Sequence, residues 1–365
     1  MKSFKDLIAD VHNKGICQQC GGCVSFCNSI EHHVIGFKHP NNPPTYLNKD
    51  KCLKCGICYL ICPQTHSLEE EVNETFQFSN FNDTPLGFYY NIYSCQANDA
   101  EFLACGTDGG VVNSLLYYLL KKDLIDGAIV AKNVSPFVRE VIIAETKDDL
   151  IMASGIKLDL TPQLDELQRF HTYTQSLPKL KQYQDKRLAV VGTPCQIYTI
   201  RCMQELGIMP SGNIEYCFGL FCYENFFFDS SQTKKFEELL GVPFNEIKKI
   251  NIKEHLIVTL EDGTKKSLNF AQLEAFMRSA CNACSDFTNL YADLSFGGLA
   301  SPEKFTTVLA RTQKGRDLML KSIKAEVLSC RKLSGQEKQD MVKTLMRYSE
   351  SKIQRKNDFF KKKEN

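Results

Sequence analysis

Two cysteine runs with the same spacing dominate the first 62 residues of this chain. Each run reads C-x-x-C-x-x-C-x-x-x-C, the first from Cys17 to Cys27 and the second from Cys52 to Cys62. Thiols placed this closely leave little room for a hydrophobic core, so the chain is expected to wrap here as tight loops around bound metal. We therefore predict a metal-binding module in this part of the chain.

A disulfide scaffold, the other use of so many cysteines, fits the composition poorly. The chain has 17 cysteines among 365 residues, an odd number and a lower density than disulfide-stapled domains show. Its first residues, MKSFKDLIAD, carry charges and no apolar stretch, so we expect no secretion signal and a cytoplasmic, reducing environment. No apolar segment is long enough to suggest a transmembrane span. The net charge of +1 argues against binding of nucleic acid.

The spacing of both runs is typical of bacterial ferredoxins with two [4Fe-4S] clusters, in which the fourth cysteine of each run binds the other cluster. This crossed pattern assigns one cluster to Cys17, Cys20, Cys23 and Cys62, and the second cluster to Cys52, Cys55, Cys58 and Cys27. Pro63 follows the second run, as the pattern expects, whereas Asn28 follows the first. Zinc is the alternative, but its four ligands usually come as two separated pairs, which does not account for two four-thiol runs.

The rest of the chain mixes helices and strands. Apolar patterns predict strands at 128–131, 141–144, 188–191, 256–260, 265–269, 292–296 and 306–311, and helices at 3–14, 109–120 and 196–206. Because these elements do not alternate strictly as strand and helix, we favour an α+β fold over a doubly wound one. We expect a ferredoxin-like domain over 1–80, a linker over 81–92 and an α+β domain over 93–333; more broadly, the acidic stretch 64–91 has the character of a linker.

The last segment, 334–365, has the pattern of a basic, weakly amphipathic helix. Ser334 and Glu337 form a capping-box pair at its start, and Lys361–Lys363 stand at its end. Two interpretations are open for this helix: a solvated tail, or a docking element for a partner subunit.

Further cysteines suggest a third metal site. Cys281 and Cys284 form a C-x-x-C pair, and Cys195 and Cys222 are candidates for the remaining ligands. Cys195 follows a Gly-Thr-Pro turn at an expected helix start, where the helix dipole favours a thiolate. Since an isolated cysteine is more often a small core residue, spacing alone leaves this site open.

A glycine-rich loop, Cys105-Gly-Thr-Asp-Gly-Gly-Val-Val, opens onto an apolar helix. Amides at such a helix start can hold a phosphate group. The chain contains neither G-x-G-x-x-G nor G-x-x-x-x-G-K-[ST], so a nucleotide cofactor would bind here in a non-Rossmann arrangement.

Four segments of the main domain resemble the family of beta subunits of coenzyme F420 hydrogenases and dehydrogenases. They are GTDGGVVNSLLYYLLKKDLIDGAIVAK at 106–132, RLAVVGTPCQIYTIR at 187–201, GLFCYENF at 219–226, and CNACSDFTNLYADLSFGG with TTVLART from 281 onward. A double cysteine run precedes this core in some members. In layout the chain resembles the input subunit of archaeal F420H2 dehydrogenases.

The resemblance implies that the α+β domain binds FAD and one further [4Fe-4S] cluster. That cluster's ligands would be Cys195, Cys222, Cys281 and Cys284, with Cys217 as the competing ligand. FAD would contact residues of five separate segments, namely Gly106, Thr107, Asp108, Gly109, Gly110, Val111, Lys157, Gly192, Thr193, Pro194, Glu224, Asn225, Gly297 and Gly298. Around Lys157 the chain reads Gly-Ile-Lys-Leu where the family commonly has Gly-Ser-Lys-Tyr, so the lysine is kept and the hydroxyls are not. The remaining cysteines are expected to be ordinary unpaired thiols, namely Cys95, Cys105, Cys202, Cys217 and Cys330.

These features together predict a flavin iron–sulfur oxidoreductase subunit. It would transfer hydride between reduced coenzyme F420 and FAD, and relay single electrons through three [4Fe-4S] clusters to or from a partner subunit or ferredoxin. Docking to a membrane-bound complex is compatible with the sequence. Two alternatives stay open: a reductase of the same family that uses ferredoxin electrons on another substrate, and a non-catalytic electron-transfer subunit. No catalytic acid or base is assigned.

Overall fold

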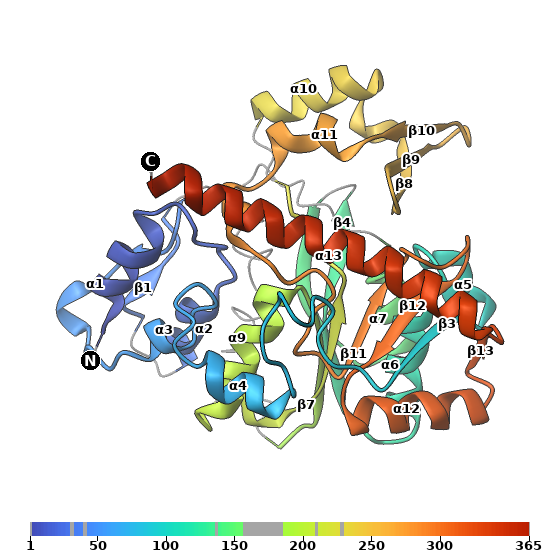
Figure 1. Cartoon of the computed structure of the whole chain (residues 1–365), viewed down its shortest axis with the longest axis horizontal. Coiled ribbons are helices and arrows are strands. Elements are labelled where there is room, and N and C mark those ends of the chain that lie inside the picture. The colour runs from blue at the N-terminus through green and yellow to red at the C-terminus, as the bar shows by residue number, and fades with distance from the viewer. Residues whose placement is uncertain are drawn as a thin grey trace.

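A computed structural model describes residues 2–29, 33–38, 42–135, 138–155, 185–208, 211–226 and 230–364. In Figure 1 the N-terminal cysteine region lies at one end, a large sheet with its helices forms the body, a small sheet stands above it, and one long helix crosses the molecule. Lys157 lies outside the described residues.

The body of the protein is an eight-stranded mixed sheet with strand order β13-β3-β12-β11-β7-β6-β4-β5. Its parallel centre consists of β4 (Gly127–Ser135), β6 (Leu188–Gly192), β7 (Ile214–Leu220) and β11 (Leu294–Gly297). Antiparallel strands flank this centre, namely β3 (Asn91–Ala97), β5 (Val138–Ala144), β12 (Thr306–Ala310) and β13 (Leu328–Cys330). All five residues of β6 are buried, as expected for a parallel strand covered on both faces.

This sheet confirms the expected mixture of helices and strands, but the preference for α+β over α/β holds only in part. The strands β6 and β7 are parallel neighbours joined through helix α9 (Pro194–Glu205), which is the β-α-β connection of an α/β sheet. The sequence did not reveal this unit, because the antiparallel strands on either side of the parallel centre interrupt the alternation of strand and helix.

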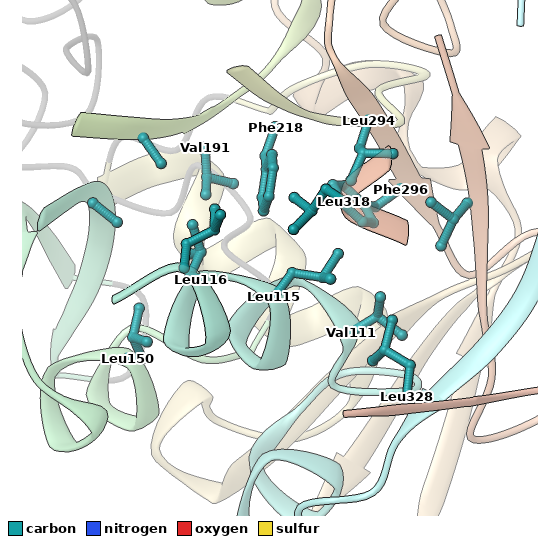
Figure 2. Close-up of a cluster of buried hydrophobic side chains, with 14 of the residues drawn as sticks. Val111, Leu115, Leu116, Leu150, Val191, Phe218, Leu294, Phe296, Leu318 and Leu328 are labelled. Atoms are coloured by element: carbon teal, nitrogen blue, oxygen red, sulfur yellow. The ribbon is translucent and has the colours of Figure 1, made fainter. Parts of the chain in front are cut away.

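Helices cover both faces of the sheet. On one face, Leu115 and Leu116 of helix α6 (Val111–Lys121) point at Val191, Phe218 and Leu294 of the central strands, as Figure 2 shows. Helices α5 (Ala100–Cys105), α7 (Lys147–Met152) and α12 (Gln313–Lys324) accompany α6. On the other face, α9 packs through its own apolar side chains, namely Ile197, Tyr198, Ile200 and Met203.

A small antiparallel sheet with its own core forms the upper part of Figure 1. It consists of β8 (Ile247–Ile252), β9 (Leu256–Leu260) and β10 (Lys265–Leu268), with helices α10 (Ser230–Leu240) and α11 (Phe270–Leu273). Strands β9 and β10, both at predicted strand positions, pair as a hairpin around Asp262-Gly263.

The N-terminal region folds around the two cysteine runs. Its elements are α1 (Phe4–Leu7), a π-helical turn (Ile8–His12), α2 (Gly22–Ser29), the short pair β1 (Ile35–Gly36) and β2 (Thr45–Tyr46), and α3 (Ile57–Leu60). The helix expected over 3–14 is present, with its second half π-helical. Each cysteine run includes a helix, α2 with Cys23 and Cys27 or α3 with Cys58, and these two helices pack against each other.

The stretch 64–91 does not have the character of a linker. It contains helix α4 (Glu69–Thr75), and Val72 and Phe78 are buried in a core shared with α9. Within the expected linker 81–92, the Arg311 guanidinium donates to the carbonyls of Leu86 and Phe88, and strand β3 already begins at residue 91. The acidic composition of this stretch comes from the solvent-facing side of α4. Because acidic residues outnumber the buried apolar ones, the sequence contained no clear sign that this helix packs on the core.

The C-terminal helix α13 (Gly335–Glu364) runs the length of the molecule and ends beside the N-terminal region (Figure 1). Its predicted capping pair is present, because the Glu337 amide donates to the Ser334 hydroxyl. The interpretation as a solvated tail is wrong, whereas docking to a partner subunit stays a prediction. Met341, Leu345 and Lys352 are buried against this same chain, and the last apolar residues pack on the N-terminal core, namely Phe359 and Phe360.

The expectation that Cys95 and Cys330 are unpaired is also wrong. They face each other across the neighbouring strands β3 and β13 and form a disulfide that joins residues 235 positions apart. Such a pairing depends on strand register and has no local sequence signal. No helix within the described ranges is both long and apolar enough to cross a bilayer.

Candidate functional site

A cavity with a volume of about 370 Å³ lies where the parallel strands end. Segments that follow the carboxyl ends of β6, β7 and β11 form its walls, together with the glycine loop before α6. This edge of a parallel sheet is where α/β proteins bind their ligands, because the loops there diverge and leave a crevice. The cavity is therefore the candidate site.

The glycine loop forms one wall through Gly106, Thr107, Asp108, Gly110 and Val111. Gly110 adopts a φ of +67°, and a Cβ there would lie 2.3 Å from the carbonyl oxygen of Phe102. The loop thus lies flat against α5, at the N-terminus of the 11-residue helix α6. Gly109 is not on the cavity wall; it is buried below it, where its amide donates to the Thr306 hydroxyl at 3.0 Å.

The turn after β6 forms a second wall through Thr193 and Pro194. Thr193 begins α9 with a capping box, in which its amide donates to the Gln196 side chain at 2.9 Å. Gly192 lies behind this wall, and its carbonyl accepts a hydrogen bond from the Asn289 amide group at 2.9 Å.

The rim is closed by the small sheet, a contribution without any signal in the sequence. Lys253, just after β8, forms an ion pair with Asp108 at 3.2 Å and donates to the carbonyl of Gly298. The Asn251 side chain donates to the Thr107 carbonyl. A Cβ at Gly298 would lie 2.3 Å from the Asp108 carboxylate, so only glycine allows the approach. Two elements that are distant in sequence thereby enclose the cavity.

Four cysteines line the inner end of the cavity: Cys195, Cys222, Cys281 and Cys284. They come from the start of α9, the loop after β7, and a short 3-10 helix at Ser279–Ala283. Burial raises the pKa of Cys222 to about 12, and it raises that of Cys195 well above its usual value. Desolvation therefore opposes the thiolate that the helix start favours at Cys195.

Cys217, the competing ligand, is not on the cavity wall. It is completely buried in strand β7 within the apolar core, and its amide donates to the Asp293 carboxylate at 2.8 Å. Glu224 and Asn225 do line the cavity. Glu224 forms an ion pair with Arg355 of α13 at 2.7 Å, and the Asn225 amide donates to the Cys281 sulfur at 3.3 Å.

The cysteines of the two N-terminal runs form an inner group and an outer group. The inner group is Cys17, Cys20, Cys23 and Cys62, and the outer group is Cys27, Cys52, Cys55 and Cys58. In the inner group, burial raises the pKa of Cys62 well above its usual value, and the neighbouring thiols of Cys20 and Cys17 raise it further. The outer group lines a small cavity of about 40 Å³ through Cys27, Cys52, Cys55 and Cys58. The last cysteine of each run thus stands with the first three of the other run.

The inner group also meets the large cavity. Gln18, Gln19 and Cys20 form part of its wall, and the Cys20 sulfur lies 3.5 Å from the Thr199 hydroxyl of α9. Arg278 donates to the Gln19 side chain at 2.9 Å. The N-terminal region is consequently built into the site rather than attached at a distance.

The donor sets fit the groups that the sequence suggests. Within the described ranges, no three His, Cys, Asp or Glu side chains converge on a single point as ligands of one ion would. A [4Fe-4S] cluster does not need such convergence, since each of its irons takes one thiolate. Three sets of four cysteines fit three clusters in donor chemistry. A glycine cradle at a helix start, where a Cβ would clash, fits a phosphate-bearing cofactor.

Comparison with known proteins agrees with this architecture. Two family models match, both for the beta subunit of coenzyme F420 hydrogenase/dehydrogenase: the model of its N-terminal part at residues 92–168, and the model of its C-terminal part at residues 185–336. A chain in the solved F420-reducing [NiFe] hydrogenase complex from Methanosarcina barkeri has the same fold. Its TM-score is 0.66 at 24% identity, covering 77% of this chain and 94% of that one.

Three curated relatives have similar levels of identity. The beta subunit of coenzyme F420 hydrogenase from Methanococcus voltae is 29% identical, over 68% of this chain and 86% of its own length. A component of the F420H2 dehydrogenase from Methanosarcina mazei is 26% identical, over 84% of this chain and 82% of its own. The coenzyme F420-dependent sulfite reductase of Methanocaldococcus jannaschii is 28% identical over 85% of this chain, which spans only 46% of that enzyme.

Together the two family matches cover most of the chain, which therefore belongs to the family of coenzyme F420 hydrogenase/dehydrogenase beta subunits. The resemblance drawn from the four sequence segments is confirmed. The family is one of F420-dependent oxidoreductases whose subunits contain FAD and iron–sulfur centres and transfer electrons.

Proposed function

We propose that this protein is a flavin iron–sulfur oxidoreductase subunit. It exchanges hydride between reduced coenzyme F420 and FAD, and it exchanges single electrons with a partner through three [4Fe-4S] clusters. One observation carries the proposal: a single cavity is lined by the glycine cradle, by four clustered cysteines and by a cysteine of the N-terminal runs.

FAD would lie against the glycine loop and the walls that face it. The candidate contacts on the cavity wall are Gly106, Thr107, Asp108, Gly110, Val111, Thr193, Pro194, Glu224, Asn225, Gly297 and Gly298. Gly109 and Gly192 would not contact FAD themselves. They lie behind these walls, where the lack of a side chain allows close packing. Bound FAD supplies the exchange between two-electron hydride chemistry and one-electron transfer.

The clusters would be held by three sets of cysteines, one in the main domain and two in the N-terminal region. The proposed ligands are Cys195, Cys222, Cys281 and Cys284; then Cys17, Cys20, Cys23 and Cys62; and then Cys27, Cys52, Cys55 and Cys58. The cysteines of the first two sets are half-buried, which limits the access of water to these thiolates and strengthens their electrostatic interactions.

The arrangement of the cysteines suggests the order of electron transfer. The four-cysteine site and the inner group share the cavity wall at Cys20, and helix α2 carries both Cys23 of the inner group and Cys27 of the outer group. The outer group reaches the surface at Cys55, which is exposed. Electrons would thus pass between the cavity and the surface through the inner group and then the outer group.

The surface around Cys55 suggests the chemistry of the partner. Leu53 is 66% exposed and Leu47 is 47% exposed. Three exposed lysines stand nearby in sequence against one aspartate: Lys49, Lys51 and Lys54, with Asp50. An apolar centre with a basic surround fits an acidic electron carrier or an acidic partner subunit.

The test is to purify the protein without oxygen, to measure its iron and flavin, and to add reduced F420 with a viologen dye. About 12 irons, four per cluster, one FAD and rapid dye reduction are expected. FAD without oxidation of reduced F420 would instead favour a reductase that acts on another substrate. Iron without FAD would favour a non-catalytic electron-transfer subunit. Either of these results would overturn the proposal.

A further inference from the structure

A lysine of the C-terminal helix is buried beside the four-cysteine site. Lys352 of α13 is only 1% exposed. Its ammonium group donates to the carbonyl oxygens of Cys222 at 2.6 Å and Asp286 at 2.7 Å. Two backbone carbonyls satisfy hydrogen bonds, but they do not neutralise the charge.

The charged groups near Lys352 form hydrogen bonds or ion pairs with other residues. The Asp286 carboxylate accepts hydrogen bonds from the amides of Asn289 and Leu290, at 2.8 and 2.9 Å. The neighbouring cation, Arg355, forms its own ion pair with Glu224. The Asp286 and Glu224 carboxylates are near enough to act on Lys352 electrostatically, but among the described residues no carboxylate forms an ion pair with it.

A buried cation that is not paired with an anion is unfavourable, because burial removes it from water. Lys352 lies on the same cavity wall as Cys222, Cys281 and Cys284, so negative charge on the cysteine side would compensate it. Four thiolates around a [4Fe-4S] cluster supply such charge, and each added electron makes the assembly more negative.

We propose that Lys352 is the counter-cation of the cluster held by Cys195, Cys222, Cys281 and Cys284, and that it raises the reduction potential of that cluster. The inference rests on the proposed function, since it presumes that a cluster binds there. In the reduction step the cluster gains one electron and the lysine keeps its proton, so the fixed positive charge favours the reduced state. Net charge around the cluster is one of the factors that set its potential.

This lysine lies outside the residues that define the family. The family match ends at residue 336, and Lys352 comes from the helix beyond it. Arg355, one turn later, also donates to the carbonyl of Tyr223 at 2.7 Å, and so holds the helix against the loop that carries Cys222. The C-terminal helix is thereby a structural part of the cluster site.

The test compares Lys352→Met, which removes the charge at similar length, with Lys352→Arg, which keeps it. Lys343→Met, at an exposed position of the same helix, is the matched control. The readout is a potentiometric titration followed by electron paramagnetic resonance, with the cluster's signal assigned as the one lost in Cys284→Ala. We expect Lys352→Met to lower the midpoint by about 59 mV, equivalent to a tenfold change in the reduction equilibrium, with Lys343→Met unchanged.

An unchanged midpoint in Lys352→Met would overturn the proposal. If Lys352→Met lost this cluster and its iron while Lys352→Arg kept both, the proposal would be supported, because charge would be the requirement. If both variants lost the cluster, packing rather than charge would be the cause and the proposal would fail. A wild-type protein without any signal that depends on Cys284 would instead refute the proposed function.

Discussion

The inner and outer cysteine groups arise from runs of identical spacing, yet they occupy different environments. Cys20 of the inner group lies against Thr199 and lines the large cavity. Cys55 of the outer group is exposed to solvent. The local sequence sets the grouping of the thiols, whereas contact with α9 makes one group internal and leaves the other at the surface.

Two glycines between the second and third cysteines of the runs show the same contrast. A Cβ at Gly22 would lie 2.2 Å from the Thr199 Cγ2 atom, so this glycine serves close packing between the N-terminal region and α9. Gly56 instead adopts a φ of +79°, so it serves the backbone turn, as does Gly21 at the equivalent position of the first run with a φ of +84°. The position of Gly22 is occupied by Ile57 in the second run, so only the first run has a glycine for this packing contact.

The largest effect is expected from removing the fourth cysteine of either run. Cys62→Ala should lose the inner cluster, about four irons, and should stop electron transfer to an external ferredoxin while reduced F420 still reduces the flavin. Cys27→Ala should lose the outer cluster and leave the inner one reducible. Iron analysis and electron paramagnetic resonance check both variants. If Cys62→Ala removed the outer signal instead, the crossed grouping would be incorrect.

The next largest effect is expected from a steric change at the contact with α9. Gly22→Ala should destabilise the protein by about 1–3 kcal/mol, because Thr199 is held by its hydrogen bond to the Cys195 carbonyl and cannot rotate away. The urea concentration that bleaches the visible iron–sulfur absorbance measures this. Adding Thr199→Ser, which removes the obstructing methyl group, should restore most of the loss.

Gly56→Ala is the matched control for that experiment. Its positive φ makes alanine unfavourable by about 1–2 kcal/mol, but Thr199→Ser should not relieve this strain. Rescue of Gly56→Ala, or no rescue of Gly22→Ala, would contradict the distinction between the two glycines.

Charge reversal at the outer surface is expected to have a smaller effect. The double variant Lys49→Glu and Lys51→Glu should slow electron transfer to an acidic two-cluster ferredoxin by about tenfold at low salt, with the difference shrinking as salt rises. Stopped-flow kinetics measures it, and Lys343→Glu on α13 is the control. Reduction of a cationic viologen should not slow. Equal slowing of both acceptors would rule out a specific electrostatic surface.

The smallest effect concerns pH and the N-terminal region. Burial lowers the pKa of His12 to about 4, and its ring packs edge-on against Phe4 at 5.7 Å. The folded state therefore favours neutral His12, so the stability it contributes is complete above about pH 6.5 and declines as the pH falls towards 4. After allowance for partial exposure we expect about 1 kcal/mol of loss at pH 5. Unfolding midpoints of His12→Phe should lack this part of the pH dependence; an unchanged profile would exclude His12 as its source.

Local patterns predicted those features that depend on neighbours in sequence. The strands on either side of Asp262-Gly263, the capping pair Ser334 and Glu337, and most other predicted strands are present in the structure. Spacing only suggested the four-cysteine site, and its full ligand set came from the family resemblance, because its cysteines come from three separate segments of the chain. The role of Lys253 at the cavity rim had no local signal, since it depends on how the small sheet packs on the glycine loop.

The sequence by itself determined that thiols gather in the N-terminal region, that a glycine cradle precedes an apolar helix, and that the chain belongs to its family. These depend on short spacings and on segments that keep their character in any context. Only the tertiary structure decided that Lys352 of a basic, weakly amphipathic helix is buried, that Cys95 pairs with Cys330, and that the inner cysteine group abuts the cavity. The physical reason is that burial and charge compensation depend on which surfaces meet, and residues far apart in the chain supply those surfaces.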